Sequence, residues 1–464
     1  MTYARRRTGG QDHPDQAHRP DRPGRPDRQG EPGPRGAPDG APHGRKPALR
    51  RRPPAGGRPP LWDRPFTLFF AARTVSQLGD AMMPVAAALA VGAVYGISGV
   101  GLVLGTWTGT FVALVLFGGV LADRFGARRM MVGADLVRVA TQGVLAIAFF
   151  TGTPPFWLLV TMAALGGAAV AMFLPGMNGM VPLVAREPQR ANATLKVADA
   201  LAHLVGPAVA GVLIALTNAG TVYAIDAGTF VVSALCLGFV RLAPGVSSPA
   251  ARGGSLRREL RQGWREFRAR TWMWSVILIW MVYGVLVFGP LVPLSSGLIG
   301  SRLGPDAYGL AVSFLGVGTV LGGLSALRVR PSRPLAAGAV AMALYTVLPL
   351  CVALDAGLPV LLTGHVLGGG AMAFWSVMWA TSVQTHTPAA VLNRVSAYEL
   401  AGSVSGIALG QVLAGPALAL ASPARLLLVS AGVCLVGCVA LFAIPAIRGL
   451  RRAAVGEGAG PAAG

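Results

Sequence analysis

The chain has 464 residues, of which 53% are hydrophobic and only 13% are charged, and its formal net charge is +21. This composition excludes an ordinary soluble globular protein and is typical of a chain with many membrane-spanning helices. The positive charge does not indicate a nucleic-acid partner, because the basic residues lie in the N-terminal segment and in short loops between apolar runs.

The N-terminal segment, residues 1–60, is rich in Pro, Gly, Arg and Asp and has almost no large apolar residues. A segment of this kind cannot bury a core, so we expect it to be disordered. Its excess of Arg leaves two interpretations open: a solvated tail, or a tail that touches anionic lipid.

Twelve apolar runs follow, each close to the ~20 residues that a helix needs to cross the hydrocarbon core. They cover residues 65–91, 99–122, 129–151, 156–182, 193–217, 221–241, 271–296, 306–327, 334–354, 358–384, 394–420 and 424–447. Arginines concentrate in the loops after the even-numbered runs, whereas the loops after the odd-numbered runs carry only Arg302 and Arg425. The positive-inside rule therefore predicts a multi-pass protein of the cell membrane with both termini in the cytoplasm.

The predicted fold is an all-α membrane protein with twelve helices in two six-helix halves related by a parallel repeat. Pro188–Asp199 before run five matches Pro388–Glu399 before run eleven, and Gly118-Gly119 is echoed by Gly322-Gly323. After Gly322-Gly323 the chain lacks the Asp and Gly that follow Gly118-Gly119, but it keeps the basic residues Arg328 and Arg333. The predicted parts are the tail 1–60, the halves 61–241 and 271–447, a linker 242–270 with an amphipathic helix at 256–268, and a tail 448–464.

Run one carries a polar stripe at helical spacing. Arg73, Gln77 and Asp80 fall on one helical face. Charged residues inside a membrane are costly and usually face a cavity or a partner. We interpret these three residues as candidates for coupling or for lining a cavity; the alternative is a structural ion pair with another helix.

Other ionisable residues lie nearer the predicted cytoplasmic ends of their runs. Asp135 and Arg138 in run three are three residues apart, which favours a local pair. Asp199 and His203 in run five, and Glu399 in run eleven, are candidates for an inner gate, with a proton site as the alternative. We group all five as gate candidates.

Aromatic residues inside the runs are candidates for lining a substrate cavity, because large aromatic surfaces suit loose recognition of apolar compounds. The alternative for each is ordinary packing or contact with lipid. These candidates are Trp107, Trp280, Tyr283, Trp375 and Trp379.

No phosphate-binding loop, metal-ligand cluster or nucleophile–base pair is recognisable in the sequence. The four cysteines lie inside apolar runs and indicate neither a disulfide framework nor a metal site. We therefore expect no enzymatic activity, no cofactor and no metal.

The loop between runs two and three reads Gly118-Gly-Val-Leu-Ala-Asp-Arg-Phe-Gly-Ala-Arg-Arg129. It resembles the signature loop of the major facilitator superfamily, with Ala127 in place of the usual Arg or Lys. The matching residues are Gly119, Asp123, Arg124, Gly126 and Arg128. Gly126 allows a sharp turn, and Asp123 is expected to accept hydrogen bonds at the start of another helix.

Residues 62–447 further resemble the third drug–proton antiporter group, which includes macrolide-efflux and enterobactin-exporter-like proteins. The resemblance is carried by Ala72–Asp80, by Leu174–Pro182 and by Gly263–Phe267. It implies a monomeric exporter of hydrophobic or amphipathic compounds, such as drugs, antibiotics or siderophore-like metabolites, driven by proton antiport. The sequence departs from other antiporter groups in having no Lys or Arg between Phe156 and Pro182. Uptake or lipid translocation by the same fold, and a non-transporting scaffold or sensor, are the alternatives.

Overall fold

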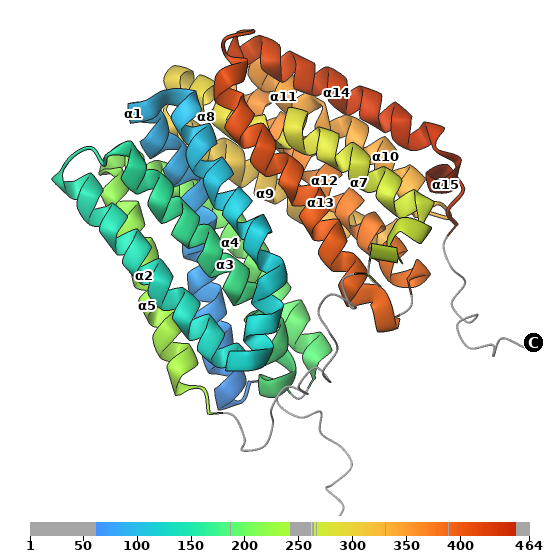
Figure 1. The fold of residues 1–464 in the computed structure, drawn as a ribbon. Coiled ribbons are helices and arrows are strands. Elements are labelled where there is room, and N and C mark those ends of the chain that lie inside the picture. The colour runs from blue at the N-terminus through green and yellow to red at the C-terminus, as the bar shows by residue number, and fades with distance from the viewer. Residues whose placement is uncertain are drawn as a thin grey trace, which may run out of the picture. The chain divides into compact units, whose positions relative to one another are not determined.

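The structure is a computed structural model that describes residues 62–185, 187–241, 261, 264–265, 267–329, 331–387 and 389–451. The predicted tail 1–60, most of the linker 242–270 and the residues from 452 onward lie outside the described residues. Every regular element in the described part is helical (Figure 1). The elements are α1 (Arg64–Phe125), α2 (Ala127–Thr151), α3 (Phe156–Val184), α4 (Pro188–Leu216), α5 (Ala219–Phe239), α7 (Thr271–Tyr283), η1 (Gly284–Phe288), α8 (Gly289–Leu303), α9 (Pro305–Arg328), α10 (Pro334–Tyr345), α11 (Val347–Ala353), α12 (Leu358–His386), α13 (Ala389–Ala417), α14 (Pro423–Ala443) and α15 (Pro445–Arg448).

Helix α1 contains two membrane crossings. Its 62 residues correspond to a length of about 93 Å at 1.5 Å per residue, roughly three times the hydrocarbon thickness. Gly96 interrupts it with φ 63° and ψ −169°, a conformation that a residue with a Cβ adopts only with strain. The described residues contain 11 helices that are long and apolar enough to cross a membrane, with α1 counted once. Division of α1 at Gly96 gives the twelve predicted crossings.

Two crossings are irregular where the sequence places proline. The seventh runs through α7, η1 and α8, and its π-helical turn η1 ends just before Pro290. Proline cannot donate the usual backbone hydrogen bond, and a π-helical turn accommodates that loss. The ninth crossing is divided into α10 and α11 at Thr346, three residues before Pro349.

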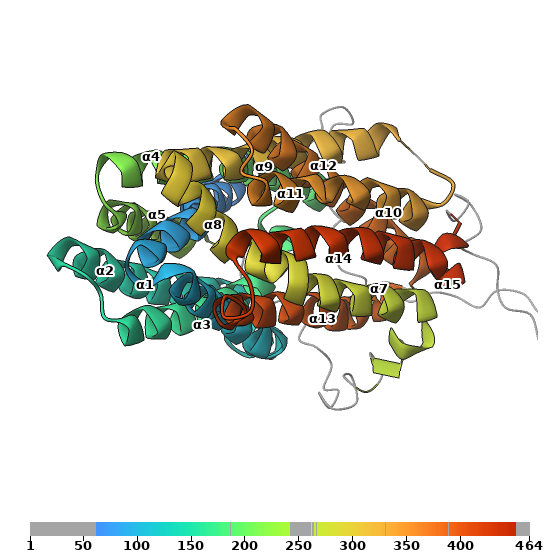
Figure 2. The same cartoon turned by 90° about the horizontal axis from the view of Figure 1, so that it is seen from above.

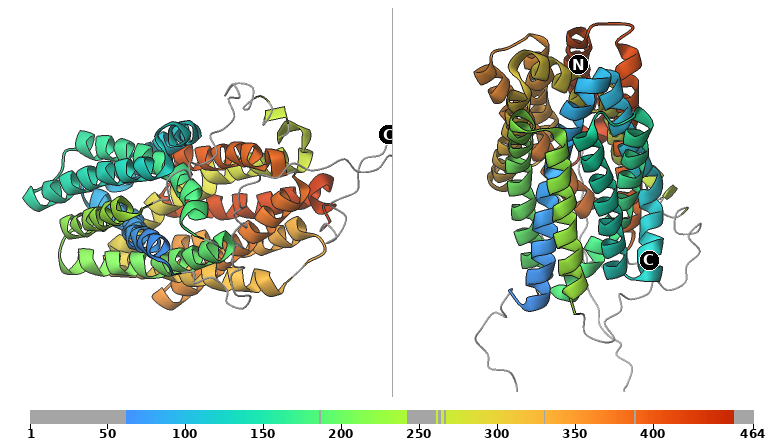
Figure 3. Two further views of the ribbon diagram at one scale, coloured as in Figure 1. Left: turned by 90° about the horizontal axis from the view of Figure 1, so that it is seen from below. Right: turned by 90° about the vertical axis from the view of Figure 1, so that its left-hand side faces the viewer.

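The helices pack as two groups. In the first, α1 to α5, α2 contacts α3 and α5, and these helices stand side by side in Figures 1 and 3. In the second, α7 to α15, α12 packs on α9 and α10, and α14 runs along α7 and α10 (Figure 2). We call these groups the N-terminal half and the C-terminal half.

The halves contact each other through α1 with α8 and α13, and through α4 with α9. Glycines make these contacts close: a Cβ on Gly101 would lie 2.3 Å from the Gln411 carbonyl oxygen of α13, and a Cβ on Gly211 would lie 3.0 Å from Gly309 of α9. Small residues permit this approach of helix backbones in membranes. The contacts at Gly101 and Gly211 lie toward the helix ends that adjoin Gly96, Gly152, Asn218, Gly304, Asp355 and Ser422, and the contact of α4 with α9 continues to His203 and Gly316 near the middle of these helices. We call the end of the molecule that holds these helix ends the Gly96 end and the opposite end the Gly126 end.

Candidate functional site

An ion pair joins α1 to α2 in the interior of the N-terminal half. Arg138 Nη1 of α2 lies 3.5 Å from Asp80 Oδ2 of α1. Arg138 is 4% exposed, whereas the Asp80 side chain is 31% exposed. The arginine is therefore enclosed by protein, and the carboxylate retains access to space outside the protein.

Two phenylalanine rings hold the Arg138 guanidinium. Its central carbon lies 4.7 Å from the ring centre of Phe173 in α3 and 4.8 Å from that of Phe230 in α5. Both rings are buried. The negative faces of aromatic rings attract a guanidinium, and most strongly where water is excluded. Four helices thus position this one cation.

Asp135 forms the second contact of Arg138. Its carboxylate is completely buried, lies 3.9 Å from Arg138 Nη1 and accepts a 2.6 Å hydrogen bond from Ser233 of α5. The local pair predicted from the spacing is therefore present, but Arg138 lies closer to Asp80, which belongs to another helix.

Asp226 of α5 is a third carboxylate in this region. It is completely buried and accepts a 2.8 Å hydrogen bond from Gln142. In the described part of the chain no cation lies within 4 Å of it. A Cβ on Gly79 would lie 2.1 Å from Asp226 Oδ1, so the absence of a side chain at position 79 allows this carboxyl group to lie against α1 beside Asp80.

We call these four residues the charge cluster: Asp80, Asp135, Arg138 and Asp226. It contains three carboxyl groups and one guanidinium. The sequence indicates Asp226 only as an outer counterpart of the gate candidates, because it lies near the outer end of run six. Its packing against Gly79 depends on how α5 meets α1, which spacing along the chain does not show.

The rest of the polar stripe of α1 contacts α4 instead. Arg73 Nη2 lies 3.3 Å from Asp199 Oδ1, and Gln77 Nε2 lies 3.1 Å from His203 Nε2. Lys196 approaches the other oxygen of Asp199 at 3.9 Å. The stripe thus divides between two neighbouring helices.

In the C-terminal half, the acidic candidate Glu399 contacts a tryptophan that belongs to an aromatic cluster. Trp379 donates a hydrogen bond from its indole nitrogen to Glu399 of α13. Trp379 also lies edge-on to Trp272, with 5.6 Å between ring centres, and Trp375 stacks on Trp280 at 4.5 Å. Glu399, the repeat counterpart of Asp199, therefore has an aromatic partner where Asp199 has a cationic one.

The five aromatic candidates differ in exposure. Tyr283 and Trp375 are buried in the core of the C-terminal half and have no open surface, and Trp379 is nearly so. Tyr283 donates a 2.7 Å hydrogen bond to the Cys434 carbonyl oxygen. Trp280 is half-buried, and Trp107 is 37% exposed and stacks on Phe111. In this conformation only the last two offer ring surface to a ligand.

The loop between α1 and α2 has the predicted turn. Gly126 has φ +87°, and Arg128 Nη1 donates a 2.6 Å hydrogen bond to the Val240 carbonyl oxygen at the end of α5. Arg124 is exposed, 5.7 Å from the Phe125 ring centre. Gly119 and Asp123 lie in α1, but the surroundings of both, and the side chain of Arg394, fall outside what the structure describes. The docking predicted for Asp123 therefore stays a prediction.

Cavities in the described part of the chain also occur outside the charge cluster. One of about 560 Å³ lies at the Gly96 end and is lined by uncharged residues of α1, α4, α8, α9 and α14. Another, of about 200 Å³, lies at the Gly126 end between α9, α10 and α12. In the described residues no group of three or more His, Cys, Asp or Glu side chains is arranged to hold a metal ion.

Comparisons with known proteins identify the family of the chain. Residues 66–408 match the model of the Major Facilitator Superfamily. Macrolide efflux protein A of Streptococcus pyogenes is 25% identical over 186 residues, which is 39% of this chain and 46% of that protein. Macrolide efflux protein A of Enterococcus faecalis is 25% identical over the same length, 57% of that protein. The match thus spans about half of these relatives.

A solved structure shows the same fold. The crystal structure of the nucleoside transporter NupG superposes with a TM-score of 0.67 at 13% sequence identity, covering 82% of this chain and 98% of that one.

Proposed function

The chain belongs to the major facilitator superfamily of membrane transporters, and we propose that it exports hydrophobic or amphipathic small molecules across the cell membrane by proton antiport. The observation that carries this proposal is the Asp80–Arg138 pair, a partly accessible carboxylate held by a buried guanidinium inside membrane helices. Such residues are costly in a membrane and mark ion pathways in transporters.

The charge cluster suits proton exchange because its charges do not balance. With every carboxyl group ionised it would carry two uncompensated negative charges in the interior of the protein. Unpaired buried charge is strongly unfavourable, and binding of protons removes it. A proton on Asp80 would also release Arg138 from its partner on α1, which couples protonation to the contact between α1 and α2.

The substrate class rests on two supports. Two of the relatives are named macrolide efflux protein A, and macrolides are large, largely apolar molecules. The ring surface offered by Trp107 and Trp280 is of the type that binds such compounds with little directional requirement.

The conformation is interpreted through the predicted topology. The halves are in close contact at the Gly96 end, which the distribution of Arg places outside the cell. We therefore interpret the structure as an inward-facing state, with the Gly126 end and both termini in the cytoplasm. Export then requires that the glycine contacts at the Gly96 end separate in the alternate state.

Direction can be tested with membrane vesicles of known sidedness. Inverted vesicles that contain the protein are energised with an acidic interior and given a radiolabelled macrolide. Export by proton antiport predicts uphill accumulation in inverted vesicles, loss of accumulation on addition of an uncoupler, and no accumulation in right-side-out vesicles energised with an acidic exterior. Accumulation only in the right-side-out vesicles would show uptake and overturn the proposal.

A further inference from the structure

The second copy of the loop between α1 and α2 has a different chemistry from the first. In ungapped register from Gly118-Gly119 onto Gly322-Gly323, Leu327 occupies the place of Asp123, and Arg328 that of Arg124. Arg330 replaces the turn glycine, and Arg333 matches Arg129. The second copy thus has an apolar residue in place of the acid and keeps two of the basic positions, although Ser332 stands in the place of Arg128.

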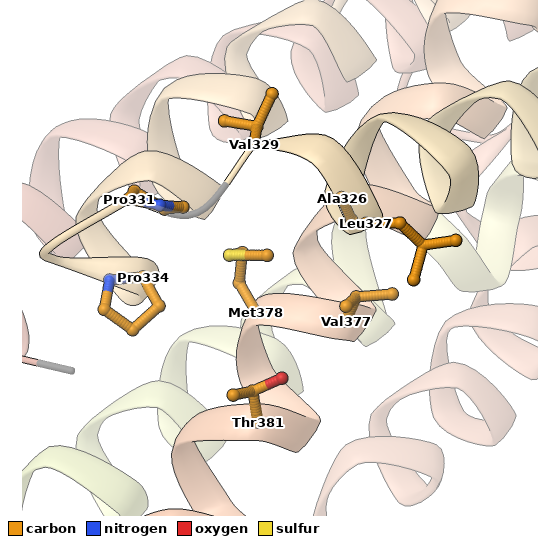
Figure 4. Close-up of a pocket in the computed structure, with 8 residues that line it drawn as sticks. All are labelled: Ala326, Leu327, Val329, Pro331, Pro334, Val377, Met378 and Thr381. Carbon is orange, nitrogen blue, oxygen red and sulfur yellow. The ribbon is translucent and has the colours of Figure 1, made fainter. Parts of the chain in front are cut away.

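An apolar pocket lies at this second copy. Its volume is about 200 Å³, and it is formed by the end of α9, the following loop, the start of α10 and one face of α12. Figure 4 shows Met378 projecting from α12 toward the loop that carries Val329 and Pro331. The lining residues are Ala326, Leu327, Val329, Pro331, Pro334, Val377, Met378 and Thr381.

The rim of the pocket is apolar and accessible. Leu327 is 67% exposed and Val329 is 50% exposed, although both are large apolar residues. Leu324, one turn before the pocket on α9, is exposed as well. Exposed apolar side chains at this end of a membrane helix offer a surface to the hydrocarbon of the bilayer.

Two exposed arginines border the pocket. Arg328 stands between two lining residues, and Arg333 directly precedes the lining residue Pro334; both are exposed. In the described part of the chain neither has a carboxylate within 4 Å. The sequence contains no Asp or Glu between Asp306 and Asp355, nor any within α12. The one acid on the three helices around the pocket is Asp306, in the first turn of α9, at the opposite end of that helix from the arginines.

We propose that this pocket binds one anionic phospholipid of the cytoplasmic leaflet, with an acyl chain on Leu327, Val329 and Met378 and the phosphate on Arg328 and Arg333. Basic sites at the cytoplasmic ends of membrane helices attract anionic headgroups, and guanidinium groups bind phosphate oxygens with paired hydrogen bonds. A soluble anion would use the arginines but not the apolar rim. A zwitterionic lipid would use the rim but gain less from the arginines.

The first copy of the loop differs from the second in its charges. There the acid Asp123 precedes Arg124, and Arg128 is already bonded to the Val240 carbonyl oxygen. The first copy therefore supplies a matched control at the same end of the molecule, with a similar number of arginines but an acidic residue in place of Leu327.

The test uses the purified full-length protein, freed of lipid in detergent and titrated with phosphatidylglycerol or phosphatidylcholine of identical acyl chains, with bound lipids counted by native mass spectrometry. We expect one tightly bound phosphatidylglycerol and weaker phosphatidylcholine. The double variant Arg328→Gln/Arg333→Gln should bind phosphatidylglycerol about tenfold more weakly or worse, whereas Arg124→Gln should bind as the wild type does. Equal binding of the two lipids, or an equal loss in Arg124→Gln, would overturn the proposal.

Two further measurements separate the headgroup from the acyl chain. Leu327→Asp, which restores the acid of the first copy at an exposed position, should abolish the tight phosphatidylglycerol, and Leu327→Asn should weaken it less. Excess inorganic phosphate should leave the lipid bound; displacement of the lipid by phosphate would show a soluble-anion site and refute the lipid assignment. Since the readout is lipid binding and not transport, these outcomes do not depend on the proposed export activity.

Discussion

Arg138 of α2 and Asp80 of α1 form an ion pair of 3.5 Å across two membrane helices, while the rings of Phe173 and Phe230 hold the same guanidinium. Arg138 therefore has two carboxylate partners. Arg138 compensates the completely buried Asp135, and it also meets a carboxylate that has access to the outside of the protein. A change at Asp80 therefore alters the contacts of Arg138, a residue of α2 that also packs on α3 and α5.

Loss of the cation should be costly to the fold. Arg138→Gln leaves the Asp135 carboxylate buried without a positive partner, and removal of one member of a buried pair typically costs about 3–5 kcal/mol. We expect a marked drop in the thermal unfolding temperature of the detergent-solubilised protein. Arg138→Lys keeps the charge but loses the planar stacking, so its unfolding temperature should lie between those of the wild type and Arg138→Gln. The exposed Arg124→Gln is the control. A wild-type unfolding temperature for Arg138→Gln would contradict the role assigned to the cluster.

Close packing of Asp226 on α1 predicts an intolerance of any side chain at position 79. In Gly79→Ala the new Cβ would lie 2.1 Å from Asp226 Oδ1 and 2.5 Å from Thr229 Oγ1. Such overpacking lowers the free energy of unfolding by about 1–3 kcal/mol, and unfolding measurements should show this loss in Gly79→Ala. In Gly133→Ala on α2 the new Cβ meets no atom within 4 Å, so this variant should be neutral or slightly stabilised. Equal effects of the two substitutions would argue against the observed position of Asp226.

The contact between the halves predicts a substitution that shifts the conformational balance. Gly101→Val would place its Cβ 2.3 Å from the Gln411 carbonyl oxygen of α13, so the two helices cannot remain in this contact. We expect the population in which the Gly96 end is open to increase. Spin labels at Asn218 and Ser422, on exposed loops of the two halves, should report a longer mean distance by pulsed electron paramagnetic resonance.

An unchanged distance distribution in Gly101→Val would contradict that account. The control is again Gly133→Ala. Its new Cβ meets no atom within 4 Å, so this variant does not disturb the contact between the halves and should keep the wild-type distribution of distances.

The pair between Arg73 and Asp199 should show energetic coupling. Both side chains are mostly buried, at 11% and 18% exposure, and lie 3.3 Å apart. Arg73→Gln and Asp199→Asn should each destabilise the protein, and the double variant should be less destabilised than the sum, with a coupling free energy of about 0.5–3 kcal/mol. Strict additivity in the double-mutant cycle would show that the two side chains do not interact.

The fold was largely predictable from local patterns. Apolar runs of membrane length give the twelve crossings, since their length depends only on hydrocarbon thickness. The turn at Gly126 and the irregularity before Pro290 follow from the chemistry of single residues. The sequence separated the first two crossings by residues 92–98, whereas in the structure Gly96 is the one residue of non-helical conformation between them.

The site was predictable only in part. Helical spacing correctly placed Arg73, Gln77 and Asp80 on one face, but spacing within one helix cannot say which neighbours that face meets. In the structure Arg73 contacts Asp199, Gln77 contacts His203, and Asp80 contacts Arg138. Aromatic composition likewise could not separate the buried Tyr283 and Trp375 from the accessible Trp107, because burial depends on the packing of distant helices.

The central claim is that Asp80 couples proton movement to export, and uphill transport by Asp80→Asn tests it most directly. The variant removes the ionisable group, keeps the shape of the side chain and leaves Arg138 in place. In inverted vesicles with an acidic interior, wild-type protein should accumulate a radiolabelled macrolide and lose it on addition of an uncoupler. Asp80→Asn should still bind the macrolide and equilibrate it down its gradient but should not accumulate it. Accumulation by Asp80→Asn with wild-type uncoupler sensitivity would contradict the account.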